Sequence, residues 1–179
     1  MLKKPMASSA LPISFTCPNF SESFIMKKEC IRPLERRDLE RVAYLVDENA
    51  MFPPEILPDL TAAFFDGDDD QRWLVFDDGQ VDAACYFVPE EMAEGVWNLL
   101  MIAIDPKRHG AGLGSQLMEA VETQLAEVGA RILLVDTSGK DDFERTRAFY
   151  DMLGYEREAR IRDYWSDGDD KVTFRKVLT

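Results

Sequence analysis

The sequence has little that could bind a metal ion. Its 179 residues include one histidine, His109, and three cysteines, Cys17, Cys30 and Cys85, which have no metal-like spacing. Cysteines without such partners are usually buried or idle free thiols. We therefore expect no metal site.

The sequence also lacks a long hydrophobic run. No stretch approaches the roughly 20 apolar residues that cross a bilayer. Prolines interrupt the first segment, MLKKPMASSALPISFTCPNF, where a signal peptide would have a continuous apolar core. The sequence therefore predicts a cytoplasmic protein that has no membrane partner.

Basic residues are few relative to acidic ones. Lysine and arginine number 21 against 34 aspartate and glutamate residues, which gives a formal net charge of −13. Such a field repels nucleic acid and favours cationic partners. The acidic clusters DGDDD at 66–70 and DGDD at 167–170 are interpreted as solvated turns, and the first lacks the ligand spacing of a calcium loop.

Length and composition predict one compact domain. With 46% hydrophobic residues, the chain is long enough to bury a core of its own. Residues 1–27 carry Pro, Ser and Asn without periodicity, so we expect an N-terminal arm or disordered extension there. The domain is then expected to span residues 28–179.

Hydrophobic patterns predict a mixed α/β sheet with flanking helices. The tetrapeptide Asp77-Asp78-Gly79-Gln80 between two apolar runs is a strong hairpin signal. The strand at 95–104 is almost wholly apolar and is expected at the centre of the sheet. The order strand, helix, strand over 95–136 predicts a right-handed parallel crossover. Further strands are expected at 28–32, 155–165 and 171–178, and helices at 39–46, before Phe65, at 113–128 and at 142–153.

Three glycines alternate after the central strand, in HGAGLGSQL. Gly110, Gly112 and Gly114 leave a line of backbone N–H groups that a large anionic group could contact. A nucleoside-triphosphate loop is excluded, because Ser115-Gln116 stands where that loop needs Lys-Ser or Lys-Thr. A dinucleotide loop needs G-x-G-x-x-G rather than G-x-G-x-G, so an oxidoreductase is the least favoured interpretation.

The same loop resembles motif A of the GNAT superfamily of N-acetyltransferases, Q/R-x-x-G-x-G/A. Ile104-Asp105-Pro106 stands for the V-x-P before the loop, and His109 occupies the Gln/Arg position. A second segment, TRAFYDMLGY at 146–155, is similar to motif B of that superfamily. The resemblance covers about 28–179. It implies a mostly antiparallel mixed sheet with one splayed parallel strand pair and flanking helices.

The resemblance implies that acetyl-CoA is the acetyl donor. Backbone N–H groups of the loop would bind its pyrophosphate at the positive end of the following helix. Unpaired backbone groups on the splayed strand would bind the pantetheine amides as an added strand does. The residues expected to bind the donor are Ile102, Ala103, Ile104, His109, Gly110, Ala111, Gly112, Leu113, Gly114 and Ser115.

The resemblance also implies a primary amine as acceptor and Tyr150 as the general acid that protonates the departing thiolate. Neighbouring positions of a helix do not share one face, so we expect Tyr150 to point away from the direction in which Phe149 packs. The helical spacing of Ala148, Phe149, Met152 and Leu153 predicts that these four residues belong to the core.

The base that deprotonates the amine has a weaker signal, because Asn98-Leu99-Leu100-Met101 in the strand before the loop contains no carboxylate. Asp136 ends the parallel neighbour and is our choice, acting through water, with Glu94 as the alternative. Phe52, in the proline-rich segment 48–60, is expected in the acceptor pocket; a packed connection between helices is an equal interpretation of that segment.

These expectations define a small-molecule or peptide amine as partner, cationic in view of the net charge, and they allow a homodimer. A binding module that holds acyl-CoA without turnover is the alternative function. The missing strand carboxylate favours that alternative, and Tyr150 disfavours it.

Overall fold

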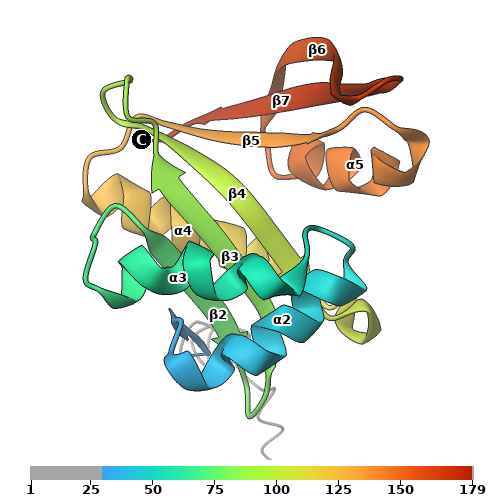
Figure 1. Ribbon diagram of the computed structural model, residues 1–179. Coiled ribbons are helices and arrows are strands. Elements are labelled where there is room, and N and C mark those ends of the chain that lie inside the picture. Colours follow the sequence, from blue (N-terminus) through green and yellow to red (C-terminus); the bar gives the residue numbers. More distant parts are fainter. Residues whose placement is uncertain (1–29, 179) are drawn as a thin grey trace, which may run out of the picture.

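The computed structural model describes residues 30–178, so the arm expected at 1–27 lies outside the described residues. A seven-stranded sheet has the order β1-β2-β3-β4-β5-β7-β6 (Figure 1). Neighbouring strands are antiparallel except β4 and β5, which are parallel, as predicted. The strands are β1 Ile31–Pro33, β2 Arg72–Asp77, β3 Val81–Pro89, β4 Val96–Ile104, β5 Ile132–Ser138, β6 Glu156–Ser166 and β7 Asp169–Val177.

Helices cover both faces of this sheet. Buried side chains of α2 and α3 pack on one face, and those of α4 and α5 pack on the other (Figure 1). Four short 3₁₀ turns lie before or between these helices. The helices are α2 Leu39–Glu48, α3 Leu57–Phe65, α4 Leu113–Glu127 and α5 Glu144–Met152, and the turns are η1 Arg36–Asp38, η2 Pro54–Ile56, η3 Pro106–Arg108 and η4 Asp141–Phe143.

The central strand β4 contributes to both cores because the β-bulge at Leu100 reverses the face that its odd-numbered residues occupy. Leu99 packs in the cluster that contains Leu117 of α4. Met101 and Ala103 pack in the cluster that contains Leu45 of α2. A strand with apolar residues on both faces belongs at the centre of a covered sheet, which is where the sequence placed it.

The parallel pair opens at one end. β4 and β5 pair from Val96 with Ile132 to Leu99 with Val135. Both strands continue beyond these residues, but they no longer pair with each other. At the same point the register between β3 and β4 shifts, so that Leu100 has no partner on β3. This bulge and the end of pairing leave backbone groups of β4 available on the side toward β5.

Of the four core residues predicted in α5 and at its C-cap, Phe149 and Leu153 pack against the core, but Ala148 and Met152 do not. Ala148 is exposed and Met152 is 70% exposed, whereas Tyr150 is buried and Phe149 and Leu153 are half-buried. Ala148 and Met152 are four residues apart, so they share one helix face, and that face is turned away from the sheet. Adjacent helical positions differ by about 100°, which lets Phe149 and Tyr150 both reach the core side.

Candidate active site

Two hollows flank the open end of the β4–β5 pair. The first, of about 320 Å³, lies between the glycine loop, the end of β4 and α5; we call it the loop cleft. The second, of about 410 Å³, lies between β4, β5, α5 and the segment after α2; we call it the strand cleft. Residues of the loop cleft include Ile102, Ile104, His109, Gly110, Gly112, Leu113, Gly114, Ser115 and Arg145, and those of the strand cleft include Phe52, Leu100, Asp136, Phe143 and Trp165.

The glycine loop makes a tight turn into α4. Gly110 and Gly112 have φ angles of 82° and 81°, in the left-handed region that favours glycine. Gly112 is the N-cap of α4, so the N–H groups of Leu113, Gly114 and Ser115 stand in a first turn that has no intrahelical acceptors for them. These donors and the positive end of the helix can bind an anion.

Gly114 has a different reason to be glycine. A Cβ atom there would lie 3.0 Å from Ile104 Cδ1 and 3.1 Å from Phe149 Cζ. Because real Cβ contacts are rarely so short, the absence of a side chain lets α4 approach both β4 and α5 closely. Gly114 therefore brings the three walls of the loop cleft together.

A buried ionic network fixes the chain just before the glycine loop. Asp105 accepts the Lys107 N–H at 2.9 Å and also contacts the Arg41 guanidinium of α2. These two interactions hold the pKa of the Asp105 carboxyl below its usual range. Asp82 of β3 accepts from Arg41 at 3.2 Å and from Arg108 at 2.6 Å. The loop is therefore attached to both α2 and β3.

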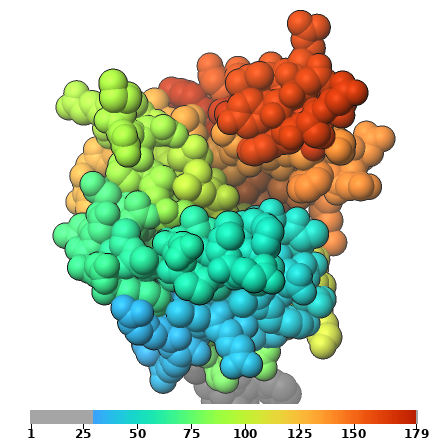
Figure 2. All heavy atoms as spheres, viewed as in Figure 1, coloured from blue at the N-terminus to red at the C-terminus, as the bar shows by residue number. Residues whose placement is uncertain are grey.

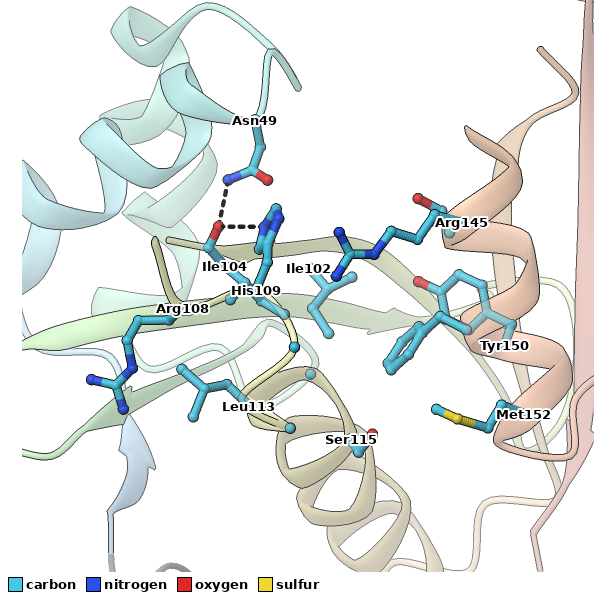
Figure 3. A pocket seen from close by; sticks show the side chains of 15 residues that line it. Asn49, Ile102, Ile104, Arg108, His109, Leu113, Ser115, Arg145, Tyr150 and Met152 are labelled. Atoms are coloured by element: carbon cyan, nitrogen blue, oxygen red, sulfur yellow. Dashed lines mark hydrogen bonds between the residues drawn. The ribbon is translucent and has the colours of Figure 1, made fainter. Parts of the chain in front are cut away.

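Arg145 supplies a cation to the loop cleft. Its guanidinium extends from α5 toward His109 and Ile102 (Figure 3). Arg108, the other arginine of the cleft, is paired with Asp82 and Asp78. Among residues 30–178, no carboxylate lies within ion-pair distance of Arg145. Its positive charge is thus available to an anionic ligand.

The two clefts meet at four shared residues, which are Asn49, Ile102, Thr146 and Tyr150. We call this point the junction. Three of the four side chains carry a polar group, although the rest of both walls near it is largely apolar. A molecule bound along one cleft can therefore meet a molecule bound in the other only beside these polar groups.

Tyr150 is the most buried residue of the junction, with 2% of its surface exposed. Its ring packs against Phe149, Tyr155 and Phe174 with centroid distances of 5.2, 5.7 and 5.3 Å. Burial raises the pKa of the Tyr150 phenol well above its usual range, with a smaller contribution from Cys85. The raised pKa keeps the hydroxyl protonated. The described part of the chain offers it no hydrogen-bond partner, so it is available to a ligand in either cleft.

Asn49 presents a fixed acceptor to the junction. Its Nδ2 donates to the Leu45 carbonyl at 2.7 Å and to the Ile104 carbonyl at 3.0 Å. Because both carbonyls can only accept, the amide cannot be reversed, and Figure 3 shows Oδ1 turned away from Ile104 toward the side of Arg145. His109 Nε2 lies 3.2 Å from the same Ile104 carbonyl, which fixes that ring beside the cleft.

Asp136 lies in the strand cleft and not at the junction. One carboxylate oxygen accepts from Lys171 Nζ at 2.9 Å and the other from Thr173 Oγ1 at 2.6 Å. Phe52 lines the same cleft from the segment after α2, and it also packs against the core beneath α2.

Most residues predicted for donor binding line the loop cleft, but two do not. Ala103 is fully buried on the opposite face of β4, because its neighbours Ile102 and Ile104 alternate with it. Ala111 is exposed outside the cleft, with its N–H bonded to the Arg108 carbonyl. Both residues were expected to contribute backbone groups rather than side chains; the Ala111 N–H is already bonded, and a backbone contact at Ala103 stays a prediction.

The sequence analysis missed three polar residues around the junction. Arg145 and Thr146 stand just before and at the start of the segment similar to motif B, so their helical spacing relative to Tyr150 could have indicated them. Asn49 offered only a weak signal, as a polar residue at the end of a predicted helix.

Residues 35–155 match the Acetyltransferase (GNAT) family, which is more than half of the chain. The chain belongs to the GNAT family. The family and its fold, including the mixed sheet with one parallel pair, are therefore as the sequence predicted, and they support acetyl transfer as the general activity. No curated protein matches this GNAT chain significantly.

Several solved structures share the fold of this GNAT protein. A crystal structure from Desulfovibrio desulfuricans, described as a GNAT-family acetyltransferase, is 24% identical with a TM-score of 0.77 and covers 83% of this chain and 98% of its own. The ribosomal-protein-S18-alanine N-acetyltransferase from Escherichia coli is 19% identical, with a TM-score of 0.68 and coverage of 83% and 93%. An aminoglycoside 6'-N-acetyltransferase complexed with coenzyme A is 13% identical, with a TM-score of 0.68 and coverage of 83% and 97%.

Two kinds of feature are absent from the described residues, a membrane-spanning helix and a metal-binding cluster. No helix within 30–178 is long and apolar enough to cross a membrane. In the same residues, His, Cys, Asp and Glu side chains form no group of three or more that could hold a metal ion.

Proposed function

We propose that the protein is a cytoplasmic N-acetyltransferase that moves an acetyl group from acetyl-CoA to a primary amine by direct attack. The observation that carries this proposal is the junction, where the loop cleft and the strand cleft share Asn49, Thr146 and Tyr150. A donor in the loop cleft and an acceptor in the strand cleft would have their reacting atoms together beside these groups.

The loop cleft has the chemistry that the donor requires. The first-turn N–H groups of α4 and the left-handed Gly112 suit a pyrophosphate, and the Arg145 guanidinium is available to a phosphate oxygen. Beyond Leu99, the side of β4 that no longer pairs with β5 can bond the amides of an extended chain. Bound acetyl-CoA supplies the activated acetyl thioester.

Two polar groups of the junction, Asn49 and Tyr150, support a route for proton transfer. Asn49 Oδ1 can accept an N–H of the incoming amine and so orient its lone pair toward the acetyl carbonyl carbon. As the new C–N bond forms and the C–S bond breaks, the Tyr150 hydroxyl gives its proton to the thiolate. The amine loses one proton in return, which water carries away.

We propose Asp136 as the residue that receives this proton through water. Both of its oxygens already accept hydrogen bonds from Lys171 and Thr173, so a bridging water suits its position better than direct contact with the amine. Phe52 and Trp165 supply apolar walls for the acceptor in the same cleft. The acceptor would be a cationic small-molecule or peptide amine, in line with the aminoglycoside and ribosomal-protein N-acetyltransferases that share the fold.

A second candidate is a module that binds acyl-CoA without turnover. The observation that favours it is the junction itself, whose four residues include no carboxylate and no histidine. Under this function, removing the Tyr150 hydroxyl would have no catalytic consequence.

The variant Tyr150→Phe separates the two functions. It keeps the ring and its packing and removes only the acid, so we expect turnover to fall by about 100- to 10,000-fold while acetyl-CoA affinity barely changes. Because burial raises the phenol's pKa, the wild-type enzyme should lose no turnover from this group up to about pH 10, its ordinary value.

Steady-state kinetics and a melting curve together measure the turnover and the stability of Tyr150→Phe against the wild type. The hydroxyl has no partner within residues 30–178, so we expect the melting temperature to stay close to that of the wild type. Wild-type turnover in the variant would remove Tyr150 from the mechanism and support the non-catalytic module.

A further inference from the structure

We infer that the acceptor is a small aliphatic diamine, whose first amine reacts at the junction and whose second, still charged amine is bound by Glu90. This inference rests on the proposed function and names the substrate class of the same site. Its basis is a third hollow, which continues the strand cleft along the sheet away from Tyr150.

The third hollow, of about 390 Å³, lies over β4, β5 and β7, and we call it the distal hollow. It shares Leu99, Leu100, Asp136 and Trp165 with the strand cleft, so the two form one groove. Figure 2 shows the surface hollowed between the teal α2–α3 layer, yellow-green β4 and orange-red β6. Clefts of this size hold small molecules.

Charge in this groove is balanced except at one residue. Asp136 is paired with Lys171 at 2.9 Å, and Asp169 is paired with Lys140 at 3.4 Å. Glu90 lines the distal hollow, and no lysine, arginine or histidine of the described residues lies within ion-pair distance of it. The lining carboxylates therefore leave one uncompensated negative charge, at the end of the groove farther along the sheet from the junction.

Glu90 is also held in place by a polar neighbour. Asn98 Nδ2 donates to Glu90 Oε1 at 2.9 Å, which fixes one carboxylate oxygen and leaves Oε2 to a ligand. Asn98 Oδ1 is buried and has no hydrogen-bond partner within the described residues. An unmet buried acceptor beside a carboxylate favours the approach of a donor, and an ammonium group is all donor.

One wall of the stretch between the two ends of the groove is apolar, and the other carries the Asp136–Lys171 ion pair. Leu100 is 52% exposed because the bulge in β4 turns it out of the sheet, and Trp165 is 50% exposed beside it. Methylene groups suit the apolar wall, whereas an ammonium group there would face a carboxylate that Lys171 already neutralises. The groove thus suits an amine, an alkyl chain and a second cation, in that order from the junction.

The two amines of such a molecule would have different protonation states. The amine at the junction must be neutral to attack, and the junction residues carry no charge that would favour its ammonium form. The amine at Glu90 gains from staying charged, because an opposite charge favours the ionised form. A monoamine in the same groove would leave Glu90 without a partner.

A series of α,ω-diamines and n-alkylamines of equal carbon number tests this inference. We expect kcat/KM of the wild type to favour each diamine of suitable length over its matched monoamine by about threefold to tenfold at low ionic strength, the range of a partly exposed ion pair. The preference should fall toward about two, the statistical factor for two equivalent amines, in Glu90→Gln and at high salt. Glu91→Gln removes the same charge from the exposed neighbour outside the groove and should keep the preference.

Equal kcat/KM for diamines and monoamines in the wild type, or a preference that survives Glu90→Gln, would overturn the inference while leaving acetyl transfer itself supported. If no amine is acetylated, calorimetric titration of hexamethylenediamine into the CoA-saturated protein still tests whether Glu90 binds an ammonium group. Weaker binding to Glu90→Gln than to Glu91→Gln supports the distal site although the proposed function has failed. Equal binding to both variants overturns the site as well.

Discussion

Arg145 is the residue whose charge in the loop cleft is free for a phosphate. Replacing it by glutamine keeps a polar side chain on the exposed side of α5 and removes the charge. We expect Arg145→Gln to weaken CoA binding by about threefold to tenfold at low ionic strength, and the loss to shrink as salt screens the contact. Isothermal titration of CoA at two salt concentrations makes the measurement.

Arg37→Gln is the matched control for that experiment. Arg37 has a 70% exposed side chain on η1 and pairs with Glu35 at 2.8 Å, away from both clefts. The substitution Arg37→Gln changes the net charge of the protein by the same amount as Arg145→Gln. Equal losses of CoA affinity in the two variants would mean that Arg145 acts only through the overall charge.

Phe52 and Asp136 remain predictions at the residue scale. Each lines the strand cleft, but each also has a structural role, Phe52 in the core beneath α2 and Asp136 in its bonds to Lys171 and Thr173. Once the acceptor is known, KM and kcat of a variant at each position can distinguish a role in the acceptor site from a structural role.

At the scale of elements, the turn into α4 is where we propose that backbone N–H groups bind the pyrophosphate of CoA. Gly112 has a φ of 81°, and a Cβ atom there would meet only Gln116 Nε2 at 3.9 Å, so side chains at this position would extend over the anion site. Asp and Asn tolerate this conformation about equally and differ by one charge. We therefore expect Gly112→Asp to bind CoA at least about tenfold more weakly than Gly112→Asn.

Gly114→Ala should behave differently from both Gly112 variants. Its new methyl group would press on Ile104 and Phe149, so we expect a lower melting temperature rather than a charge-dependent loss of CoA affinity. Calorimetry and melting curves on the three variants distinguish these effects. Equal CoA affinity for Gly112→Asp and Gly112→Asn would contradict the prediction that the pyrophosphate of CoA binds at this turn.

Local patterns predicted the elements of the fold well. The apolar run of β4, the Asp78-Gly79 turn and the helical spacing of α4 each depend on residues close in sequence, and each was found within a few residues of its predicted bounds. The parallel β4–β5 pair also followed from chain order alone. These features need no knowledge of distant contacts.

The inward face of α5 and the composition of the junction could not be predicted in this way. Which side of α5 is buried depends on Tyr155, just before β6, and on Phe174 of β7, which both pack against Tyr150. Asn49 reaches the junction only because α2 ends beside the Ile104 carbonyl. Glu90 stands out only once lysines elsewhere in the chain are seen to pair with Asp136 and Asp169.

At the scale of the whole molecule, the acidic net charge has a more limited meaning than the sequence indicated. A charge of −13 attracts cations to the surface in general. Along the groove proposed for the acceptor, however, Asp136 of β5 and Asp169 of β7 are each paired with a lysine. Under the proposed function, the general attraction of an amine to the protein and its selection in the groove would depend on different carboxylates.

The most direct measurement of the central claim follows both products of one reaction. The protein is incubated with acetyl-CoA and, separately, with polyamines, amino acids, aminoglycosides and peptide amines, while released CoA thiol and acetylated amine are quantified. We expect at least one amine to yield equal amounts of the two products, as direct transfer requires. Tight binding of CoA with no acetylated product from any amine would contradict the claim and identify a non-catalytic acyl-CoA-binding module.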